Sequence, residues 1–520
     1  MKRDEQIGKI KKGACFDIVI IGGGATGLGT AVDAATRGYS TLLVEQNDFA
    51  KGTSSRSTKL VHGGVRYLAQ GDVSLVYHAL HERGRMKRNA PHLVKDMRFV
   101  IGAYRWWEKA FYTIGLTLYD ILAGRLGLGR SLPLSIKKVT NDIPTLIKKG
   151  LKGGIIYHDG QFDDARMAVT LAQTAIDNGA ICLNYMMFNG LQKDDEGGIS
   201  GVTIEDQLTK ETYSIAAKAV INATGVFVDD IMNMAEPGSK KKVKPSQGVH
   251  IVVDSTFLGG RSALMIPKTK DGRVLFGVPW HGKVVLGTTD TPLDNAMLEP
   301  KALDEEIDFI LDQAGQYLEK KPGRSDVLSV FAGLRPLAAP AHEGNMKTKE
   351  ISRSHKIYKS DSGMLTVTGG KWTTYREMAE DAVNQTIKMA GLPFKQCVTK
   401  HLRQHGYLKN ADMSTWDYVY GSDIDFINRL IEEDPSNVEL LHEGYTFRKA
   451  HVVWAVREEM AYTVEDVLAR RVRLLFLDAR AAVEIAPKVA SIMASEMGKD
   501  RLWEEEQISE FRALAKNYIL

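Results

Sequence analysis

Cysteine is scarce in this chain of 520 residues, which contains only Cys15, Cys182 and Cys397. The three residues lie far apart and form no Cys-x-x-Cys pair. A disulfide framework or a zinc site would need several thiols at short, regular spacing, so neither is expected. Scattered single cysteines are typical of proteins from a reducing compartment.

Long apolar runs are missing as well. No stretch of about 18 or more consecutive apolar residues occurs, and we therefore expect no transmembrane helix. Residues 1–13 carry charges but lack an apolar core of signal-peptide length, so secretion is not expected. Attachment to a membrane surface remains open.

Neither sign of charge dominates. The chain has 68 Lys and Arg against 64 Asp and Glu, a net charge of +4. This balance is too mild to indicate a nucleic-acid partner, but it suits an anionic substrate or contact with an anionic membrane. Asp159, Asp163 and Asp164 lie close in sequence, yet their spacing matches no calcium loop and no histidine pattern surrounds them. We expect a helix cap near Asp164 and no metal site.

The sequence does contain the alternating elements of an α/β protein. Residues 16–21 are a short apolar run that ends at glycines, residues 28–37 favour a helix, and residues 40–45 are a second apolar run. This is the size and order of one βαβ unit. Length alone favours about two or three domains.

Later segments predict a mixed sheet followed by a helical tail. The segments 217–223 and 363–368 are short strands that run into glycine, and residues 288–290 are expected to form a structural turn. From about Met389 onward, apolar residues recur every three or four positions, which indicates a helical domain. Antiparallel strands are predicted at 248–253, 273–279 and 283–288.

A dinucleotide-binding fingerprint lies at the first strand–helix junction. Gly22, Gly24 and Gly27 satisfy Gly-x-Gly-x-x-Gly, which permits a tight turn, close approach of a pyrophosphate and close helix packing. Glu45 ends the second strand about 20 residues later, where its carboxylate would accept from ribose hydroxyls and repel a 2′-phosphate. The pattern disfavours NADP but leaves NAD and FAD open.

Polar and glycine-rich segments farther along the chain favour a flavin. The loop 53–59 has hydroxyl and cationic side chains suited to a pyrophosphate or ribityl chain, although a solvated surface loop is the alternative. A second strand–glycine–helix junction at 368–375 would aim a helix N-terminus and Lys371 at the end of a flavin where reduction builds negative charge. The candidate cofactor-binding residues in these segments are Thr53, Ser54, Ser55, Ser57, Thr58, Lys59, Gly63, Gly64, Gly369 and Gly370.

The motifs together resemble one family. GGGATG, TSSRSTKLVHGGVRYL, DGQFDDAR, NATGVFVDD, GTTDTP, GLRP and TGGKWTTYREMAE occur in the order seen in FAD-dependent, quinone-linked glycerol-3-phosphate dehydrogenases. The tail segment EDVLARRVRLLFLDARAA resembles that family's C-terminal domain. The resemblance implies FAD as cofactor and adds Gly225, in NATGVFVDD, to the cofactor-binding candidates.

The resemblance also implies a fold of three parts. A split Rossmann-like FAD-binding domain of the glutathione-reductase or D-amino-acid-oxidase type would carry an antiparallel-sheet substrate domain and a helical C-terminal domain. The expected segments are 1–98, 151–240 and 331–388 for FAD binding, 99–150 for a substrate or cap segment, 241–330 for the substrate domain and 389–520 for the helical domain.

The activity implied is oxidation of sn-glycerol 3-phosphate to dihydroxyacetone phosphate, with electrons passed to menaquinone or ubiquinone. An oxygen-using oxidase of the same family is the first alternative, and a non-catalytic or macromolecule-modifying flavoprotein is the second. The quinone-linked family implies a cytoplasmic protein attached peripherally to the inner face of the cell membrane. A homodimer is left open.

Phosphate capture needs arginine forks and hydroxyl donors. Arg66, Tyr67 and Arg353 occupy family positions for substrate binding, and Arg56 in the polar loop is a rival for phosphate. The alternative for any of these arginines is a surface ion pair.

Oxidation of an alcohol needs a base for the hydroxyl proton and a positive environment for the oxygen. The resemblance makes His250 the candidate base, places Arg335 near the C2 oxygen and Lys371 near the flavin, and gives Thr373 a helper role at the same helix start. A satisfied structural histidine is the alternative for His250.

Residues 104–123 predict an amphipathic helix. Apolar residues recur at helical spacing and basic residues flank them, as in a helix that lies in a membrane interface. A helix that faces the protein core is the alternative. The apolar stripe consists of Trp107, Phe111, Ile114, Leu118 and Ile121.

Overall fold

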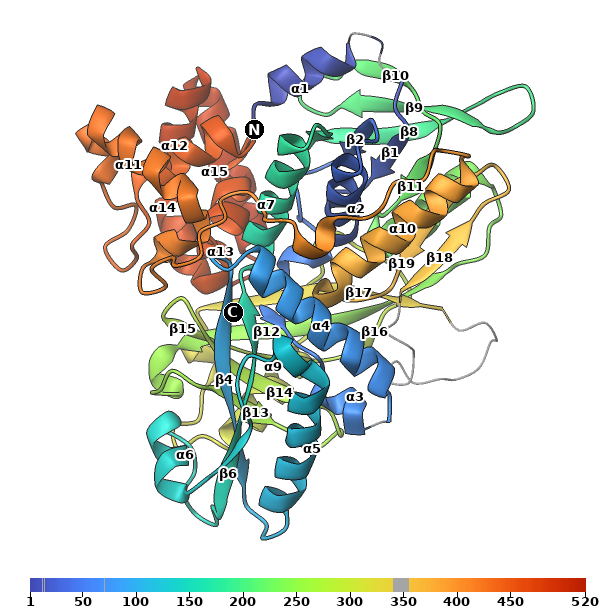
Figure 1. Ribbon diagram of the computed structural model, residues 1–520. Coiled ribbons are helices and arrows are strands. Elements are labelled where there is room, and N and C mark those ends of the chain that lie inside the picture. The colour runs from blue at the N-terminus through green and yellow to red at the C-terminus, as the bar shows by residue number, and fades with distance from the viewer. Residues whose placement is uncertain (12, 14, 70, 340–354) are drawn as a thin grey trace.

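A six-stranded sheet carries the glycine-rich turn. The computed structural model (Figure 1) describes residues 1–520 apart from 12, 14, 70 and 340–354. The strand order is β18-β19-β11-β1-β2-β7, parallel except for the edge strand β18. The strands are β1 (Ile18–Ile21), β2 (Thr41–Val44), β7 (Ile181–Leu183), β11 (Val220–Asn222), β18 (Lys356–Lys359) and β19 (Met364–Thr368).

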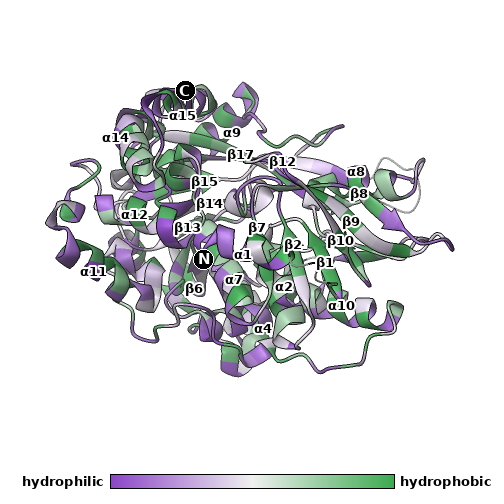
Figure 2. Cartoon of the chain, turned by 90° about the horizontal axis from the view of Figure 1, so that it is seen from above, coloured by the Kyte–Doolittle hydropathy of each residue, from purple (hydrophilic) through white to green (hydrophobic). Residues whose placement is uncertain are grey.

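Both faces of this sheet are buried, which explains why its strands are continuous apolar runs. Ile18 and Ile20 pack against the helices of one face, whereas Val19 and Ile21 pack against a three-stranded antiparallel sheet on the other. Figure 2 shows β1 and β2 in the green of apolar residues. The helices are α2 (Ala25–Thr36), α7 (Asp164–Asp177) and α10 (Tyr375–Met389), and the strands of the small sheet are β8 (Met186–Lys193), β9 (Ile199–Asp206) and β10 (Thr212–Ala216).

A larger, mostly antiparallel sheet lies below the first in Figure 1. Helices α6 (Ile136–Asp142) and α9 (Asp304–Gly315) share one apolar cluster with it, and α5 (Glu108–Ala123) shares another. Its strands are β3 (Leu60–Val61), β4 (Val94–Ala103), β5 (Leu132–Leu134), β6 (Gly153–Phe162), β12 (Val243–Asp254), β13 (Ala263–Ile266), β14 (Leu275–Trp280), β15 (Lys283–Gly287), β16 (Thr291–Pro292) and β17 (Ser329–Ala338).

The strands of the large sheet differ from the expected segments at two places. β6 lies within 151–240, which was expected to bind FAD, but it pairs along its whole length with β4. β17 begins the expected segment 331–388, yet it pairs with β12. Long antiparallel pairings fix both strands in the large sheet, so the chain crosses between the two sheets later than the sequence suggested.

The C-terminal residues form helices, as predicted, and appear orange to red in Figure 1. They pack against α7 and β17, and the backbone N–H of Val330 donates to the carbonyl of Tyr518 at 2.9 Å. These helices are α11 (Ile424–Glu433), α12 (Lys449–Glu458), a π-helix (Asp466–Arg471), α13 (Leu474–Leu477), α14 (Ala479–Met497) and α15 (Arg501–Ala515).

The remaining helices flank these layers. α4 shares a small apolar cluster with α5. None of the helices among the described residues is both long and apolar enough to cross a membrane. The remaining helices are α1 (Arg3–Ile10), α3 (Val65–Ala69), α4 (Val73–Asn89) and α8 (Val228–Ala235).

Helix α5 turns its apolar stripe away from the core. Trp107 and Leu118 are partly exposed, and Phe111, Ile114 and Ile121 are 58%, 73% and 68% exposed. The buried side chains of α5 are instead Leu116, Tyr119 and Ala123. The core-facing alternative for the stripe is therefore wrong.

Candidate active site

A cavity of about 460 Å³ lies where the two large sheets meet, a size typical of cofactor and ligand sites. The glycine-rich turn, loop 45–58 and helix α3 line one part of it. Strands β12 and β17 and the turn 369–373 line another. Segments far apart in the sequence thus converge on one space.

The three glycines of the fingerprint take the predicted places. Gly22 has a positive φ of 109°, and a Cβ on Gly27 would collide with the carbonyl of Gly22, so α2 packs closely on β1. Gly24 precedes α2 and lines the cavity, where a Cβ would meet only the Oγ of Ser54 at 3.1 Å. The N-terminus of α2 is therefore open to an anion.

Glu45 lies at the same end of the cavity. Its Oε2 accepts from the N–H of Gly23 at 2.7 Å and its Oε1 accepts from the N–H of Asn47 at 2.9 Å. Burial raises the pKa of this carboxyl. A carboxylate has about four lone-pair sites, so acceptors remain for ribose hydroxyls.

The polar loop 53–59 divides between two directions. Thr53, Ser54, Ser57 and Thr58 line the cavity, but Lys59 turns away from it. The Nζ of Lys59 donates to the carbonyl of Ser55 and to Asp164, each at 2.7 Å, and the side chain is fully buried. Neither Ser55 nor Lys59 lines the cavity, so the structure does not bring these two predicted residues to the cofactor space.

Other predicted cofactor residues are likewise divided. Gly64, Gly225, Gly369 and Gly370 line the cavity. Gly63 lies behind it, with its N–H donating to the Oη of Tyr119 at 2.7 Å.

His250 projects from β12 into the cavity wall. Its Nε2 lies 2.9 Å from the Oγ1 of Thr58, and its ring stacks on Phe331 at 4.9 Å between centroids. Burial holds the pKa of His250 well below its ordinary value, and the cations of Lys59 and Arg335 lower it further. His250 is therefore a neutral imidazole able to accept a proton. The cation expected beside Arg335 was Lys371, whereas the structure adds Lys59.

Arg335 is held by the segment 288–290. Its Nη2 donates to the Oγ1 of Thr288 at 3.1 Å and to the carbonyl of Thr289 at 3.0 Å, and its Nη1 lies 3.4 Å from Asp290. A Cβ on Gly248 would collide with this guanidinium. The segment expected to be only a turn thus lines the cavity and orients Arg335.

Lys371 and Tyr67 both line the cavity and contact each other there. The Nζ of Lys371 lies 3.8 Å from the centre of the Tyr67 ring, a cation–π contact. Thr373 and Arg66 also line the cavity. Arg353 lies outside the described residues.

Two arginines have other roles in the structure than the sequence suggested. Arg56 donates to the carbonyl of Ala332 at 3.1 Å and to Glu299 at 2.7 Å, so it is engaged as a structural residue. Arg273 lines the cavity although the sequence did not single it out, and it pairs with Asp271. The available signal was the Asp271-Gly272 turn directly before a predicted strand.

Comparison with known proteins agrees with this geometry. Residues 17–376 match the FAD dependent oxidoreductase family, and residues 365–507 match the C-terminal domain of alpha-glycerophosphate oxidase. The mitochondrial glycerol-3-phosphate dehydrogenase of Arabidopsis thaliana is 38% identical over 97% of this chain and 86% of its own length. This chain belongs to the family of FAD-dependent glycerol-3-phosphate dehydrogenases. The Rattus norvegicus family member is also 38% identical, over 97% of this chain and 74% of its own.

A solved structure of the family extends the likeness to the fold. The glycerol-3-phosphate dehydrogenase from Bacillus halodurans, complexed with FAD, aligns with a TM-score of 0.80 and 31% identity. The alignment covers 99% of this chain and 97% of that one. The predicted family, three-part fold and FAD cofactor are confirmed.

The residues present fit FAD. The N-terminus of α2 and the hydroxyl of Ser54, which accepts from the N–H of Ala25 and can still donate its own proton, suit a pyrophosphate, whereas the Ser57 hydroxyl donates to Asp164. The positive φ angles of Gly369 and Gly370 bring bare backbone to the cavity just before the turn Trp372–Thr374 and α10. The cofactor-binding roles of individual residues remain predictions.

Proposed function

We propose that this protein oxidises sn-glycerol 3-phosphate to dihydroxyacetone phosphate and passes the electrons to a membrane quinone, menaquinone or ubiquinone. The family supports the substrate and the cofactor. The observation that carries the proposal is the neutral, buried His250 beside Arg335 in the cavity that has the FAD fingerprint.

The residues of the cavity divide the reaction between them. Bound FAD supplies a hydride acceptor for the hydrogen on C2. His250 accepts the proton of the C2 hydroxyl as the hydride leaves C2, so the O–H and C–H bonds break and the C–O single bond becomes a carbonyl. Arg335 stabilises the negative charge that develops on the oxygen. Arg66 and Arg353 are the proposed ligands of the phosphate, with Tyr67 and Thr373 beside the substrate and Lys371 beside the flavin.

Anaerobic mixing tests this function. Holoprotein under argon should lose its oxidised flavin absorbance on addition of sn-glycerol 3-phosphate, and glycerol should act far more weakly. His250→Asn should retain FAD but slow the reduction by about 10²–10⁴-fold, the usual effect of losing a general base. A flavin that stays oxidised in the parent protein would reject the proposal in favour of a flavoprotein with another role.

An oxygen-using oxidase is the second candidate, because residues 365–507 match the domain described from alpha-glycerophosphate oxidase. Both candidates share flavin reduction and differ in the acceptor. Stoichiometric hydrogen peroxide in aerobic turnover would identify the oxidase, whereas rapid reoxidation by a soluble quinone analogue supports the dehydrogenase.

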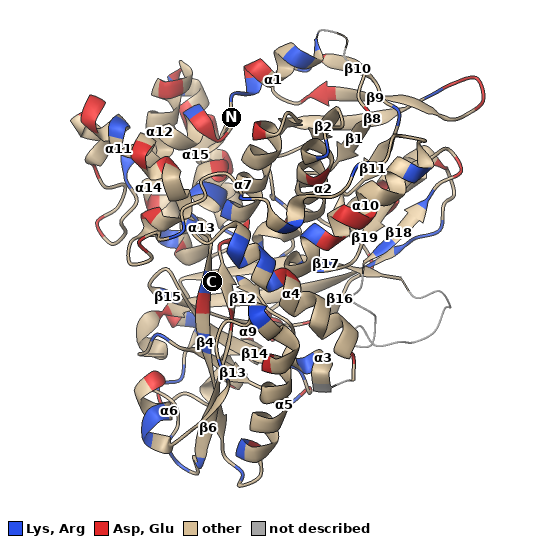
Figure 3. Cartoon of the chain, in the orientation of Figure 1, with Lys and Arg blue, Asp and Glu red and all other residues tan. Residues whose placement is uncertain are grey.

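The proposed quinone route requires a membrane surface, and α5 is suited to it. Its exposed apolar stripe is accompanied by Trp106, which is 86% exposed. Figure 3 shows α5 as largely uncharged. Arg105, Arg125 and Arg130 flank the helix, as expected for contact with anionic headgroups. We propose peripheral attachment through α5 to the inner face of the cell membrane.

A further inference from the structure

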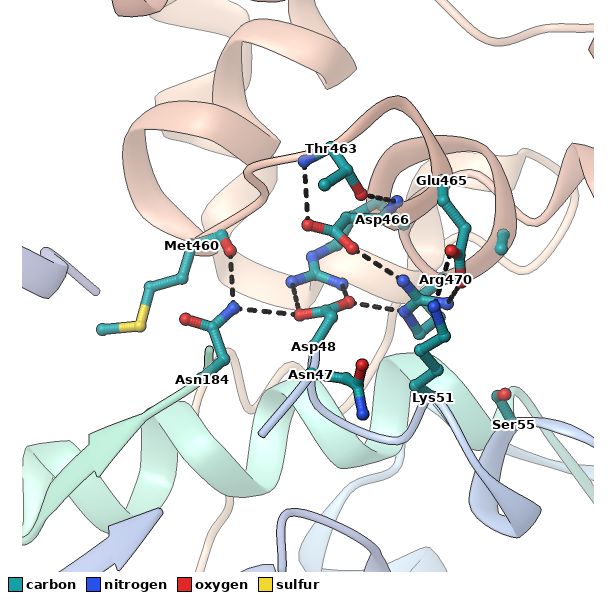
Figure 4. Close-up of polar contacts among 12 residues, drawn as sticks. Asn47, Asp48, Lys51, Ser55, Asn184, Met460, Thr463, Glu465, Asp466 and Arg470 are labelled. Carbon is teal, nitrogen blue, oxygen red and sulfur yellow. Dashed lines mark hydrogen bonds and ion pairs between the residues drawn. The ribbon is translucent and has the colours of Figure 1, made fainter. Parts of the chain in front are cut away.

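The C-terminal domain contacts loop 45–58, which lines the cavity, through Asp48 and Lys51 (Figure 4). Asp48 of this loop accepts from the Nε of Arg470 at 2.6 Å and from the Nη1 of Arg471 at 2.8 Å. Lys51, one turn farther along the loop, pairs with Glu465 at 2.8 Å. Arg470 and Arg471 belong to the π-helix, so the wall of the cavity rests on the C-terminal domain.

Arg473, just beyond the π-helix, extends this support toward the catalytic end. Its Nη2 donates to the carbonyl of Ser55 at 3.0 Å and to Asp164 at 2.8 Å. Lys59 binds the same two partners, and Asp164 also accepts from the backbone N–H and Oγ of Ser57. The side chains of Arg473, Asp164 and Lys59 are fully buried.

Two contacts join this buried group to His250. Thr58, the residue before Lys59, lies with its hydroxyl against the Nε2 of His250. The ring of Phe331 contacts both His250 and Lys59. His250 stacks on it, and the Nζ of Lys59 is 5.1 Å from its centre. Phe476 of the C-terminal domain packs edge-on against Phe331 at 5.0 Å.

We propose that Lys59, fixed by Asp164 and Arg473, is a positioning residue that keeps His250 neutral and oriented for proton transfer. The inference rests on the proposed role of His250 as base. A cation held behind the imidazole disfavours a second proton on the ring. The contact with Thr58 engages Nε2 and so fixes the orientation of the ring, while Nδ1 is buried without a hydrogen-bond partner among the described residues.

The charges around His250 set the direction of the expected change. Burial lowers the pKa of His250 most, and the cations of Lys59 and Arg335 both lower it further. Asp163, Asp164 and Arg473 surround Lys59 rather than the imidazole. Burial lowers the pKa of Lys59 itself to about 7, so Lys59 is charged in the acidic range where His250 takes up its proton. Loss of the Lys59 charge must therefore raise the pKa of His250.

The experiment is a pH titration of Lys59→Met and its parent as holoproteins. We expect the acid limb of the flavin-reduction rate to move up by about one pH unit or more. Lys59→Arg should restore the limb. If Lys59→Met does not fold, Lys59→Met/Asp164→Asn removes both members of the pair and should show the same shift. Arg37→Met, which breaks the buried Arg37–Asp33 pair elsewhere, is the matched control and should leave the limb in place.

A second measurement does not depend on turnover. Protein labelled with ¹⁵N-histidine gives the tautomer and titration of each of its 13 histidines, and His250→Asn identifies the signal of interest. An upward shift of that titration in Lys59→Met supports the inference even if glycerol 3-phosphate fails to reduce the parent flavin. A titration unmoved in Lys59→Met, or moved equally in Arg37→Met, overturns it.

Discussion

The glycines of the dinucleotide turn differ in what surrounds their missing side chains. At Gly27 the space is filled by the backbone of Gly22, so any Cβ disrupts the protein itself. At Gly24 the space opens into the cavity, so a side chain there collides mainly with a ligand. One turn thus contains one position that serves folding and one that serves binding.

This contrast predicts that Gly24→Val folds but loses FAD. The ratio of flavin absorbance to protein absorbance after dialysis measures occupancy, and circular dichroism checks the fold. Gly27→Val is the comparison: it should lose FAD and, unlike Gly24→Val, should also lower the melting temperature of the apoprotein. Full flavin occupancy in a folded Gly24→Val protein would show that the pyrophosphate does not approach this residue.

Arg335→Lys should be damaging although it keeps the charge. The planar guanidinium donates through Nη2 to Thr288 and Thr289 and through Nη1 to the carbonyl of Gln247 at 3.2 Å, and a single ammonium nitrogen cannot reproduce that fork. We expect flavin reduction to slow by about 10- to 150-fold, the equivalent of about 1.5–3 kcal/mol. Anaerobic stopped-flow measures this, with the surface substitution Arg324→Lys as control. A rate within twofold of the parent (about 0.4 kcal/mol) would make Arg335 a structural residue.

His250 and Gly248 lie two residues apart on a predicted strand, and both line the cavity, as residues on the same face of a strand do. Lys59 belongs to an irregular loop, where no period decides which way a side chain points. Its partner, Asp164, lies about 100 residues later, beyond strands β3 to β6, and could not be inferred from spacing.

At the scale of elements, α5 shows how much a helical period can and cannot tell. The residues Phe111, Ile114, Leu118 and Ile121 lie along one helix, as predicted, although the helix begins at Glu108 rather than at residue 104 and Trp107 is its N-cap. Periodicity does not say whether that face meets the core, since a core and a membrane select the same residues. The neighbouring face, with Leu116 and Tyr119, took the core side because it shares apolar clusters with β6 and α4.

The exposed stripe predicts membrane binding that depends on individual apolar residues. Ile114→Asp should weaken co-sedimentation with phosphatidylglycerol vesicles by about tenfold or more, since burying one large aliphatic side chain contributes about 1.5–3 kcal/mol. Leu502→Asp changes a side chain that is equally exposed on α15 and should have no effect. Parent protein that stays in the supernatant would contradict the attachment. A parent dimer that Ile114→Asp converts to monomer would assign the face to self-association instead.

The sequence predicted the positions of several strands but not which strands pair with each other. Alternation identified β14 and β15 as antiparallel strands, and they pair with each other as neighbours in the chain. β6 and β17 pair with strands that are distant in sequence, which local patterns do not specify. Their assignment to the FAD-binding segments followed from the family resemblance and not from any pairing signal in the sequence.

At the scale of the whole molecule, the helical tail is joined to the FAD-binding unit by buried charges. Arg166 of α7 forms a two-pronged pair with Glu459, with both distances 2.7 Å. Breaking one partner of such a pair typically costs about 3–5 kcal/mol, because the other charge is left buried. The helical C-terminal domain is therefore joined to α7 by a buried contact whose loss would be costly, a contact that the periodicity of its sequence could not reveal.

A partly exposed histidine between the same two units gives this junction a pH dependence. His405 contacts Asp177 of α7 through Nδ1 at 2.6 Å and Asp423 through Nε2 at 3.0 Å. Burial opposes its protonation, but these two carboxylates together raise the pKa of His405 to about 9. In the unfolded chain the pKa is about 6.5. The stabilisation is therefore complete below about pH 6.5 and is lost as the pH rises toward 9.

His405→Asn should consequently lower the melting temperature of the holoprotein more at pH 6 than at pH 9.5. The difference between variant and parent is the decisive quantity, because Lys59 acts in the opposite sense. Its folded pKa, about 7, is depressed, so its own contribution favours folding increasingly above neutrality. His401→Asn, which changes an exposed histidine nearby, controls for the loss of an imidazole. A melting difference that is the same at both pH values would show that His405 does not join the two units through its charge.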